Sequence, residues 1–282
     1  YEPNSMGGNA REASAAEGGF VSYPASTDGT KQRVRSKSFG DHFTQATMFY
    51  NSMSDPEKMH ITQALQFELG KVMVEEVRQR MVDLLANVDG DLATNVGDYL
   101  GLTPKAGQVN ANAGKAKGLS QLEYVPGTPM GRKVAILATD GVNGSELSAM
   151  QNALQGAGVT VELVATHLGT IQSSDDASFP VNQSVLTTDS VLYDAVYVPG
   201  GADSASALQA SGKAVEFIQN AFKHYKPIAS SSEGANFLKA ASIGTESGVI
   251  SGQGANVATN FLKAIVQHRF CDRKLPASMS PQ

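Results

Sequence analysis

The sequence predicts a mixed α/β protein in which an extended arm and a four-helix segment precede a three-layer αβα domain. The first stretch has no helix or strand period, the next keeps helical spacing for about sixty residues, and the second half alternates short apolar runs with helical segments. We therefore expect an arm over 1–40, a helical domain over 41–100, a linker over 101–130 and an α/β domain over 131–282.

Composition and charge restrict the function classes. The 282 residues are 41% hydrophobic and 17% charged, which is enough apolar material for a sizeable core. A net charge of -5 without any Lys- or Arg-rich run argues against nucleic acid as a partner, and no apolar run approaches the roughly 20 residues of a membrane helix. The single cysteine, Cys271, excludes internal disulfides and multi-cysteine zinc sites, so we predict no metal site.

The arm is rich in Gly, Pro, Ser and Asn, too rich for a packed element, and has apolar anchors at Phe20, Val21 and Tyr23. An arm without a core of its own is either disordered or laid across a partner surface. Because the chain has no initiator Met and opens in a loop, we expect it to come from the middle of a longer protein. Targeting residues would then be missing, so the compartment is unknown: cytoplasmic is the default, and export stays open.

Helical spacing predicts four helices after the arm, near residues 41–53, 55–73, 74–87 and 90–100. Ser54 and Glu57 have the spacing of a capping box, and Pro56 suits the first turn because its missing N–H costs little there. We predict no catalytic chemistry in this half. The linker that follows contains Pro104, Pro126 and Pro129, which indicates a partly flexible, partly extended connection.

The second half repeats a β-α-β pattern. Its expected strands are the apolar runs KVAILA at 133–138, VTVELVA at 159–165, YDAVYVPGG at 193–201 and the run 227–229. Its expected helices cover 146–155, 213–224 and 256–269, and a small hairpin is expected within 168–186. Strands that are apolar almost throughout are covered on both faces, which predicts a parallel sheet in a flavodoxin-like three-layer sandwich.

The stretch KPIASSSEGANFL, Lys226–Leu238, organises this second half. An apolar strand enters, a Ser/Gly corner turns and a helix leaves, which is the shape of a nucleophile elbow. In an open α/β sheet such a corner lies at the carboxyl ends of the strands, where ligands usually bind. The elbow is therefore the first place to look for reactive side chains.

The helical half closely resembles a known family. The match covers RSKSFGDHFTQATMFYNSMSDPEKMHITQALQFELGKV at 35–72, the opening YEPNS, and RQRMVDLLANVDGDLA at 78–93. It resembles the region that follows the haem-binding core of haem catalases, and the further domain behind it is similar to the large-subunit class. The resemblance implies a parent that decomposes hydrogen peroxide to water and oxygen with haem, as a homotetramer whose wrapping arm threads between subunits.

The haem site itself does not come with this resemblance. The family holds haem iron through a Tyr in an Arg-x-x-x-Tyr pattern, and no Arg of this sequence has a Tyr four residues later. The distal His and Asn of the family belong to a segment upstream of Tyr1. We therefore expect no cofactor and no catalase activity for this chain alone, and a role in assembly and stability of the tetramer.

The α/β half resembles the class I glutamine amidotransferase-like superfamily, in particular its PfpI-like proteases, glyoxalases and holdase chaperones. The likeness rests on YDAVYVPGG at 193–201 and KPIASSSEG at 226–234. It implies that Ser232 stands where the superfamily has a Cys, with Glu146 near the acidic position. Gly200 and Gly201 fall on the backbone donors of an oxyanion site.

Ser232 departs from that family in its chemistry. A thiol is readily made a thiolate, whereas a serine hydroxyl needs a general base. Hydrolytic members have a His next to the Cys, and here that position is Glu233; His167, at the end of the second strand, is the remaining candidate base. Two alternatives to the catalase hypothesis stay open: a holdase chaperone with unfolded client proteins, and a hydrolase or glyoxalase-like enzyme with a Ser232–His167–Glu146 triad.

Overall fold

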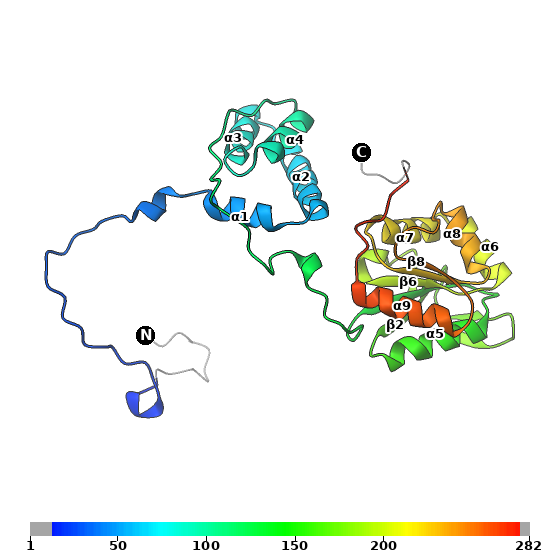
Figure 1. The fold of residues 1–282 in the computed structure, drawn as a ribbon. Helices are drawn as coiled ribbons and strands as arrows, with labels where there is room; N and C mark the ends of the chain where they lie inside the picture. The colour runs from blue at the N-terminus through cyan, green and yellow to red at the C-terminus, as the bar shows by residue number, and fades with distance from the viewer. Residues whose placement is uncertain (1–12, 277–282) are drawn as a thin grey trace. The chain divides into compact units, whose positions relative to one another are not determined.

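The computed structural model describes residues 13–276 (Figure 1). It divides into a unit that ends at His42 and a unit that begins at Phe43, and we describe each by itself. The opening YEPNS of the catalase-like match lies outside the described residues. Within residues 13–276, no helix combines the length and the apolar character that crossing a membrane requires.

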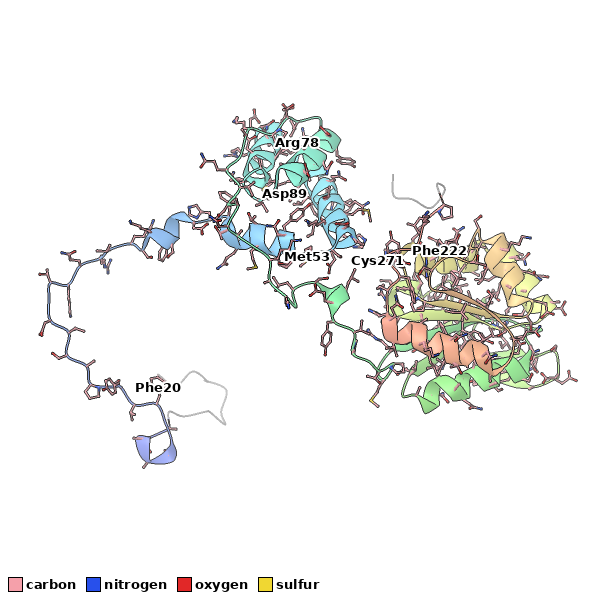
Figure 2. The ribbon with its side chains drawn as sticks, viewed as in Figure 1. Phe20, Met53, Arg78, Asp89, Phe222 and Cys271 are labelled. Atoms are coloured by element: carbon pink, nitrogen blue, oxygen red, sulfur yellow. The ribbon has the colours of Figure 1, made fainter. Side chains whose placement is uncertain are left out.

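The described part of the arm is extended, interrupted by two short 3-10 turns, η1 Ala15–Glu17 and η2 Lys37–Gly40. The first turn is held by Glu17, whose carboxylate accepts hydrogen bonds from the N–H and the hydroxyl of Ser14. The predicted anchors are all exposed: Phe20, labelled in Figure 2, is 103% exposed, Tyr23 is 89% exposed and Val21 is 64% exposed. The arm therefore offers large apolar side chains that it does not bury itself.

Four helices follow, where helical spacing predicted them: α1 Thr44–Ser52, α2 Asp55–Gly70, α3 Glu75–Leu85 and α4 Gly90–Leu100. The predicted capping box of α2 is confirmed, because Glu57 accepts from the Ser54 N–H at 2.9 Å and Pro56 lies in the first turn. Asp89, labelled in Figure 2, caps α4 by accepting from the Leu92 N–H at 2.8 Å. The buried centre of this segment comes from these helices: Tyr50, Val82, Leu85, Leu92, Ala93 and Val96.

The linker lies along these helices through several backbone donors. The Lys105 N–H donates to Asp83 at 3.0 Å and the Ala116 N–H donates to Ser52 Oγ at 2.9 Å. Further on, Ser120 Oγ and the Gln121 N–H both donate to Glu57, at 2.8 and 2.9 Å. Composition alone predicted a partly flexible linker. It could not reveal these hydrogen bonds, because their acceptors lie on helices far away in the sequence.

The α/β domain contains one parallel sheet of six strands in the order β5-β2-β1-β6-β7-β8. The strands are β1 Lys133–Leu137, β2 Thr160–Ala165, β5 Gln183–Ser184, β6 Ala195–Val198, β7 Ile228–Ser231 and β8 Val249–Gly252. The predicted mixed α/β class with a parallel sheet is therefore confirmed. Without the two-residue β5, the five remaining strands lie in the order 2-1-3-4-5, so the winding reverses between β1 and β6.

Helices cover both faces of this sheet (Figure 1). One face carries α5 Gly144–Gly156 and α9 Ala255–Gln267, and the other carries α6 Ala202–Ala210, α7 Gly212–Lys223 and α8 Gly234–Ala240. Each face has its own buried cluster, and the strands between them are almost fully buried. The sandwich thus has two hydrophobic cores separated by the sheet.

Three features refine the predicted elements. The expected hairpin is present as the antiparallel pair β3 Thr170–Gln172 and β4 Ser178–Pro180. The strand β8 was not predicted, because VISG is short and half-exposed at the sheet edge. The helix α6 was not predicted either, because its residues ADSASALQA are small and have little apolar periodicity.

Candidate functional site

The corner after β7 has the backbone of a nucleophile elbow. Ser232 follows the buried strand β7 directly, precedes α8, and has φ +44°. A non-glycine residue in the left-handed region is uncommon and is a feature of strained functional turns. The predicted elbow residue therefore stands on a sharp strand-to-helix turn, at the carboxyl end of the sheet.

Glu146 joins this corner to two other loops. The Ser232 hydroxyl donates to Glu146 Oε1 at 2.6 Å, and the Gly200 N–H donates to Glu146 Oε2 at 2.8 Å. Glu146 lies in the first turn of α5, where its own N–H donates to the capping Asn143 at 3.1 Å. The structure thus brings together three of the residues singled out from the sequence, at the point where the winding of the sheet reverses.

The two candidate oxyanion donors both face carboxylates. Gly200 donates to Glu146, and the Gly201 N–H donates to Glu233 Oε2 at 3.0 Å. The bond from Gly201 lowers the pKa of Glu233 below its ordinary value. Fixed side-chain carboxylates therefore occupy the N–H groups that an oxyanion would use.

Gly200 allows the close approach of these loops. A Cβ at this position would lie 2.7 Å from Glu146 Oε2 and 2.8 Å from Ser232 Cβ, both shorter than contact distance. Any side chain would push the corner after β7 away from α5. The hydrogen bonds of Glu146 therefore depend on a glycine at the end of β6.

His167 lies in a different pair. Its Nε2 is 3.0 Å from Asp140 Oδ2 and its Nδ1 is 3.0 Å from the Leu168 carbonyl oxygen. The Leu168 carbonyl and the Asp140 carboxylate raise the pKa of His167. Both ring nitrogens are engaged, and none of the hydrogen bonds of the described residues joins His167 to Ser232. The structure therefore assembles the Ser232–Glu146 pair without a histidine between them.

A groove of about 560 Å³ lies beside the elbow, lined by residues of α5 and α9 and by Tyr197 and Ser231 of the sheet. Sequence reasoning missed Tyr197 and Ser231. Their signal was present, since Tyr197 is the polar position within AVYV and Ser231 directly precedes the elbow residue. Across residues 13–276 there is no group of three or more His, Cys, Asp or Glu side chains placed to hold a metal ion.

The chemistry that this arrangement supports is limited by the absence of a strong base at Ser232. The hydroxyl proton is already directed at a carboxylate, which is a weak base for generating an alkoxide. The same bonds fix the corner after β7 against the loops after β1 and β6. The cluster is therefore a tight junction of three loops next to an open apolar groove.

Two family models match this chain. The model described as "C-terminal domain found in long catalases" matches residues 130–275, and the one described as "Catalase-related immune-responsive" matches residues 36–100. Among similar proteins, Catalase-2 of Bacillus subtilis is 38% identical over 283 residues, covering 98% of this chain and 40% of the relative. A catalase of Alkalihalophilus pseudofirmus is 36% identical over 275 residues, with 97% and 40% covered. Catalase HPII of Pseudomonas aeruginosa is 36% identical over 287 residues, with 100% and 40% covered.

Proposed function

The chain belongs to the family of C-terminal domains found in long catalases, and we propose that it acts as the C-terminal portion of a catalase that decomposes hydrogen peroxide to water and oxygen. The observation that carries this proposal is the collinear match: the chain spans about 40% of the length of the relatives, while 97% or more of it is matched. The helical and α/β segments also match their family models in the same order. The peroxide chemistry then resides in the remaining part of such a catalase.

A haem group does not fit the residues present. Tyrosinate ligation needs a hydroxyl that is free to meet iron. The two tyrosines buried in the sandwich are engaged: Tyr193 donates to Glu162 at 2.7 Å, and Tyr197 shares a hydrogen bond with Ser231 at 2.8 Å. No tyrosine follows an arginine at the spacing expected for the proximal ligand. We therefore place the haem in the part of the catalase that this chain does not include.

Within such a catalase, the proposed role of this chain is assembly and stability of a homotetramer through the arm. The support is the exposure of Phe20 and Tyr23 in an extended segment without a core. Burying two such aromatic side chains against another subunit contributes about 1.5–3 kcal/mol each. An arm of this kind gains its order only from a partner surface.

A chimera tests both parts of the proposal. The portion of Bacillus subtilis Catalase-2 that this chain does not match is joined to residues 1–282 of this chain. We expect a haem absorbance, oxygen evolution from peroxide, and a tetramer in sedimentation velocity. The variant Phe20→Ser/Tyr23→Ser should lower the tetramer fraction several-fold, while Leu186→Ser/Val191→Ser, which removes exposed apolar groups of the α/β domain, should not. A soluble chimera without oxygen evolution contradicts the catalase assignment, and an arm variant that assembles normally contradicts the assembly role.

For the α/β domain we propose a flavodoxin-like fold of the PfpI type. The strand order 2-1-3-4-5 supports the first part, and the junction of Ser232, Glu146 and Gly200 supports the second. In this proposal the elbow is retained as architecture, with Ser232 in place of a reactive thiol.

A holdase function is the second candidate, favoured by exposed apolar side chains between β5 and β6. Leu186, Val191 and Leu192 are 76%, 75% and 58% exposed. A chain with this function suppresses heat aggregation of a client protein without ATP. The variant Leu186→Ser/Val191→Ser should lose that suppression and Phe20→Ser/Tyr23→Ser should keep it; no suppression by the unmodified chain removes the candidate.

A Ser232-dependent hydrolase or glyoxalase-like enzyme is the third candidate, favoured by the elbow backbone and by the bond from Ser232 to Glu146. Its test is turnover of a small ester and of methylglyoxal by the unmodified chain and by Ser232→Ala. Loss of turnover in the variant supports it. Equal rates end it.

A further inference from the structure

The groove beside the elbow lies along α5 and α9, two helices on one face of the sheet (Figure 1). Its volume of about 560 Å³ lies within the usual range of small-molecule pockets, about 300–1,000 Å³. Its walls are short or apolar side chains of α5 and α9: Ala149, Met150, Ala153, Ala258, Thr259 and Leu262. Alanines on both helices leave a space that longer side chains would fill.

The lining of the groove includes a pair of hydroxyls with one proton left to donate. Tyr197 and Ser231 line the groove and are 1% and 3% exposed, and their hydroxyl oxygens lie 2.8 Å apart. Two hydroxyls carry two protons, and the bond between them uses one. Within residues 13–276, neither oxygen has a second hydrogen-bond partner. Burial raises the pKa of Tyr197 to about 12, and the charge of Glu146 also raises it, so the phenol keeps its proton at neutral pH.

Glu146, which also lines the groove, provides an acceptor. Its carboxylate accepts one bond from Ser232 and one from Gly200. A carboxylate has about four acceptor positions, so two remain. The groove therefore combines apolar walls, one buried O–H donor and one negatively charged acceptor.

We propose that this groove binds a small neutral molecule with an apolar body and a hydroxyl head. The head oxygen accepts a hydrogen bond from the Tyr197–Ser231 pair, and its proton is donated to Glu146. A carboxylate head is repelled by the charge of Glu146. An ammonium head has no lone pair with which to accept a hydrogen bond from the hydroxyl pair. A neutral hydroxyl head can both accept from this pair and donate to Glu146.

Three probes that differ only in the head group test this preference on the whole chain. They are 4-phenylbutan-1-ol, 4-phenylbutyrate and 4-phenylbutylammonium, titrated by isothermal calorimetry with ligand-observed NMR as a second readout. We expect saturable binding of the alcohol at one site per chain, about tenfold tighter than either charged probe. Absence of saturable alcohol binding, or equal affinity for the three probes, overturns the proposal.

Variants locate the binding within the groove. Ala258→Phe fills the space between α5 and α9 and should abolish alcohol binding, whereas Ala207→Phe, at an exposed position of α6 on the opposite face, should bind as the unmodified chain does. The double variant Tyr197→Phe/Ser231→Ala removes both donors and should weaken alcohol binding about tenfold. Each single variant keeps one hydroxyl proton and should retain the alcohol preference.

Alcohol binding that is unchanged in Ala258→Phe overturns the proposal, and so does an unchanged preference in the double variant. Far-UV circular dichroism shows whether each variant is folded. If the double variant does not fold, the comparison of Ala258→Phe with Ala207→Phe decides, because both introduce the same side chain at helical alanines.

Discussion

At the residue scale, the elbow depends on a few short contacts between three loops. Ser232 and Gly200 donate to the two oxygens of Glu146, and Gly201 donates to Glu233. The sequence indicated Ser232, Glu146, Gly200 and Gly201 as candidates. It could not indicate that carboxylates occupy both glycine N–H groups, because these bonds join residues 54 and 32 positions apart.

Replacing Gly200 tests how tightly this junction is packed. Gly200→Ala places a methyl group 2.7 Å from Glu146 Oε2 and 2.8 Å from Ser232 Cβ. We expect the free energy of unfolding to fall by about 1–3 kcal/mol, as for other overpacked sites. Urea denaturation of Gly200→Ala and of Gly156→Ala measures this effect, since nothing lies within 4 Å of a Cβ at Gly156. Equal stability of Gly200→Ala and the unmodified chain would contradict the packing described.

Asp194 gives a pH-dependent prediction. Burial by itself raises its pKa, but the hydrogen bond from His268, the Lys133 N–H and the charge of Arg132 lower the pKa to about 2. A carboxyl with a depressed folded-state pKa stabilises the protein above its unfolded pKa of about 3.9 and loses that contribution as the pH falls through the folded pKa. The carboxylate form should therefore contribute about 2 kcal/mol near neutral pH.

The variant Asp194→Asn should lower the free energy of unfolding by that amount at about pH 6, and the difference should shrink steadily between about pH 4 and pH 2. Urea titrations at several pH values measure it. Asp176→Asn, at an exposed carboxylate, is the control and should show little change at any pH. A constant difference across this pH range would show that charge is not the cause.

At the element scale, one side chain of the helical segment accepts hydrogen bonds both from its own helix and from the linker. Glu57 closes the capping box of α2 and also accepts from Ser120 and Gln121 of the linker. Local sequence predicted the first role, because a capping box spans four residues. The second role could not be predicted from local sequence, because the donors of the linker are 63 and 64 positions away.

Removing Glu57 should therefore affect the linker as well as the helix. We expect Glu57→Ala to lower the free energy of unfolding by about 1–2 kcal/mol and to speed tryptic cleavage after Lys115 and Lys117 several-fold. The matched variant is Glu68→Ala on the same helix, whose exposed ion pair with Lys71 contributes little. Cleavage at the same rate in both variants would show that the bonds from the linker to Glu57 do not hold the linker in solution.

At the scale of the whole molecule, residues 13–276 consist of an arm without buried residues in its described part, a helical segment with its linker, and a sandwich with two cores. Within residues 13–276, the two tyrosines buried in the sandwich are both hydrogen-bonded to other side chains. The arm instead exposes side chains that only a partner can bury. This division is consistent with the proposal made above, in which the chain serves the assembly of a catalase.

The corresponding prediction concerns the chain by itself. With added haem it should evolve oxygen from peroxide no faster than free haem does, because no tyrosine has the Arg-x-x-x-Tyr spacing of the proximal ligand and the two tyrosines buried in the sandwich are hydrogen-bonded. Oxygen-electrode rates and the haem absorbance spectrum measure this. A tyrosinate-type spectrum together with turnover above free haem would contradict the placement of the haem outside this chain.

The sequence by itself determined the class of the fold, most helices and strands, the catalase likeness and the residue on the elbow. These depend on local period, capping and motif, which act over a few neighbouring residues. Only the tertiary structure decided that His167 pairs with Asp140 rather than Ser232, that Glu146 closes the elbow, and that alanines of α5 and α9 leave a groove. Those contacts arise from the order of the strands, which places side chains from distant positions at one edge of the sheet.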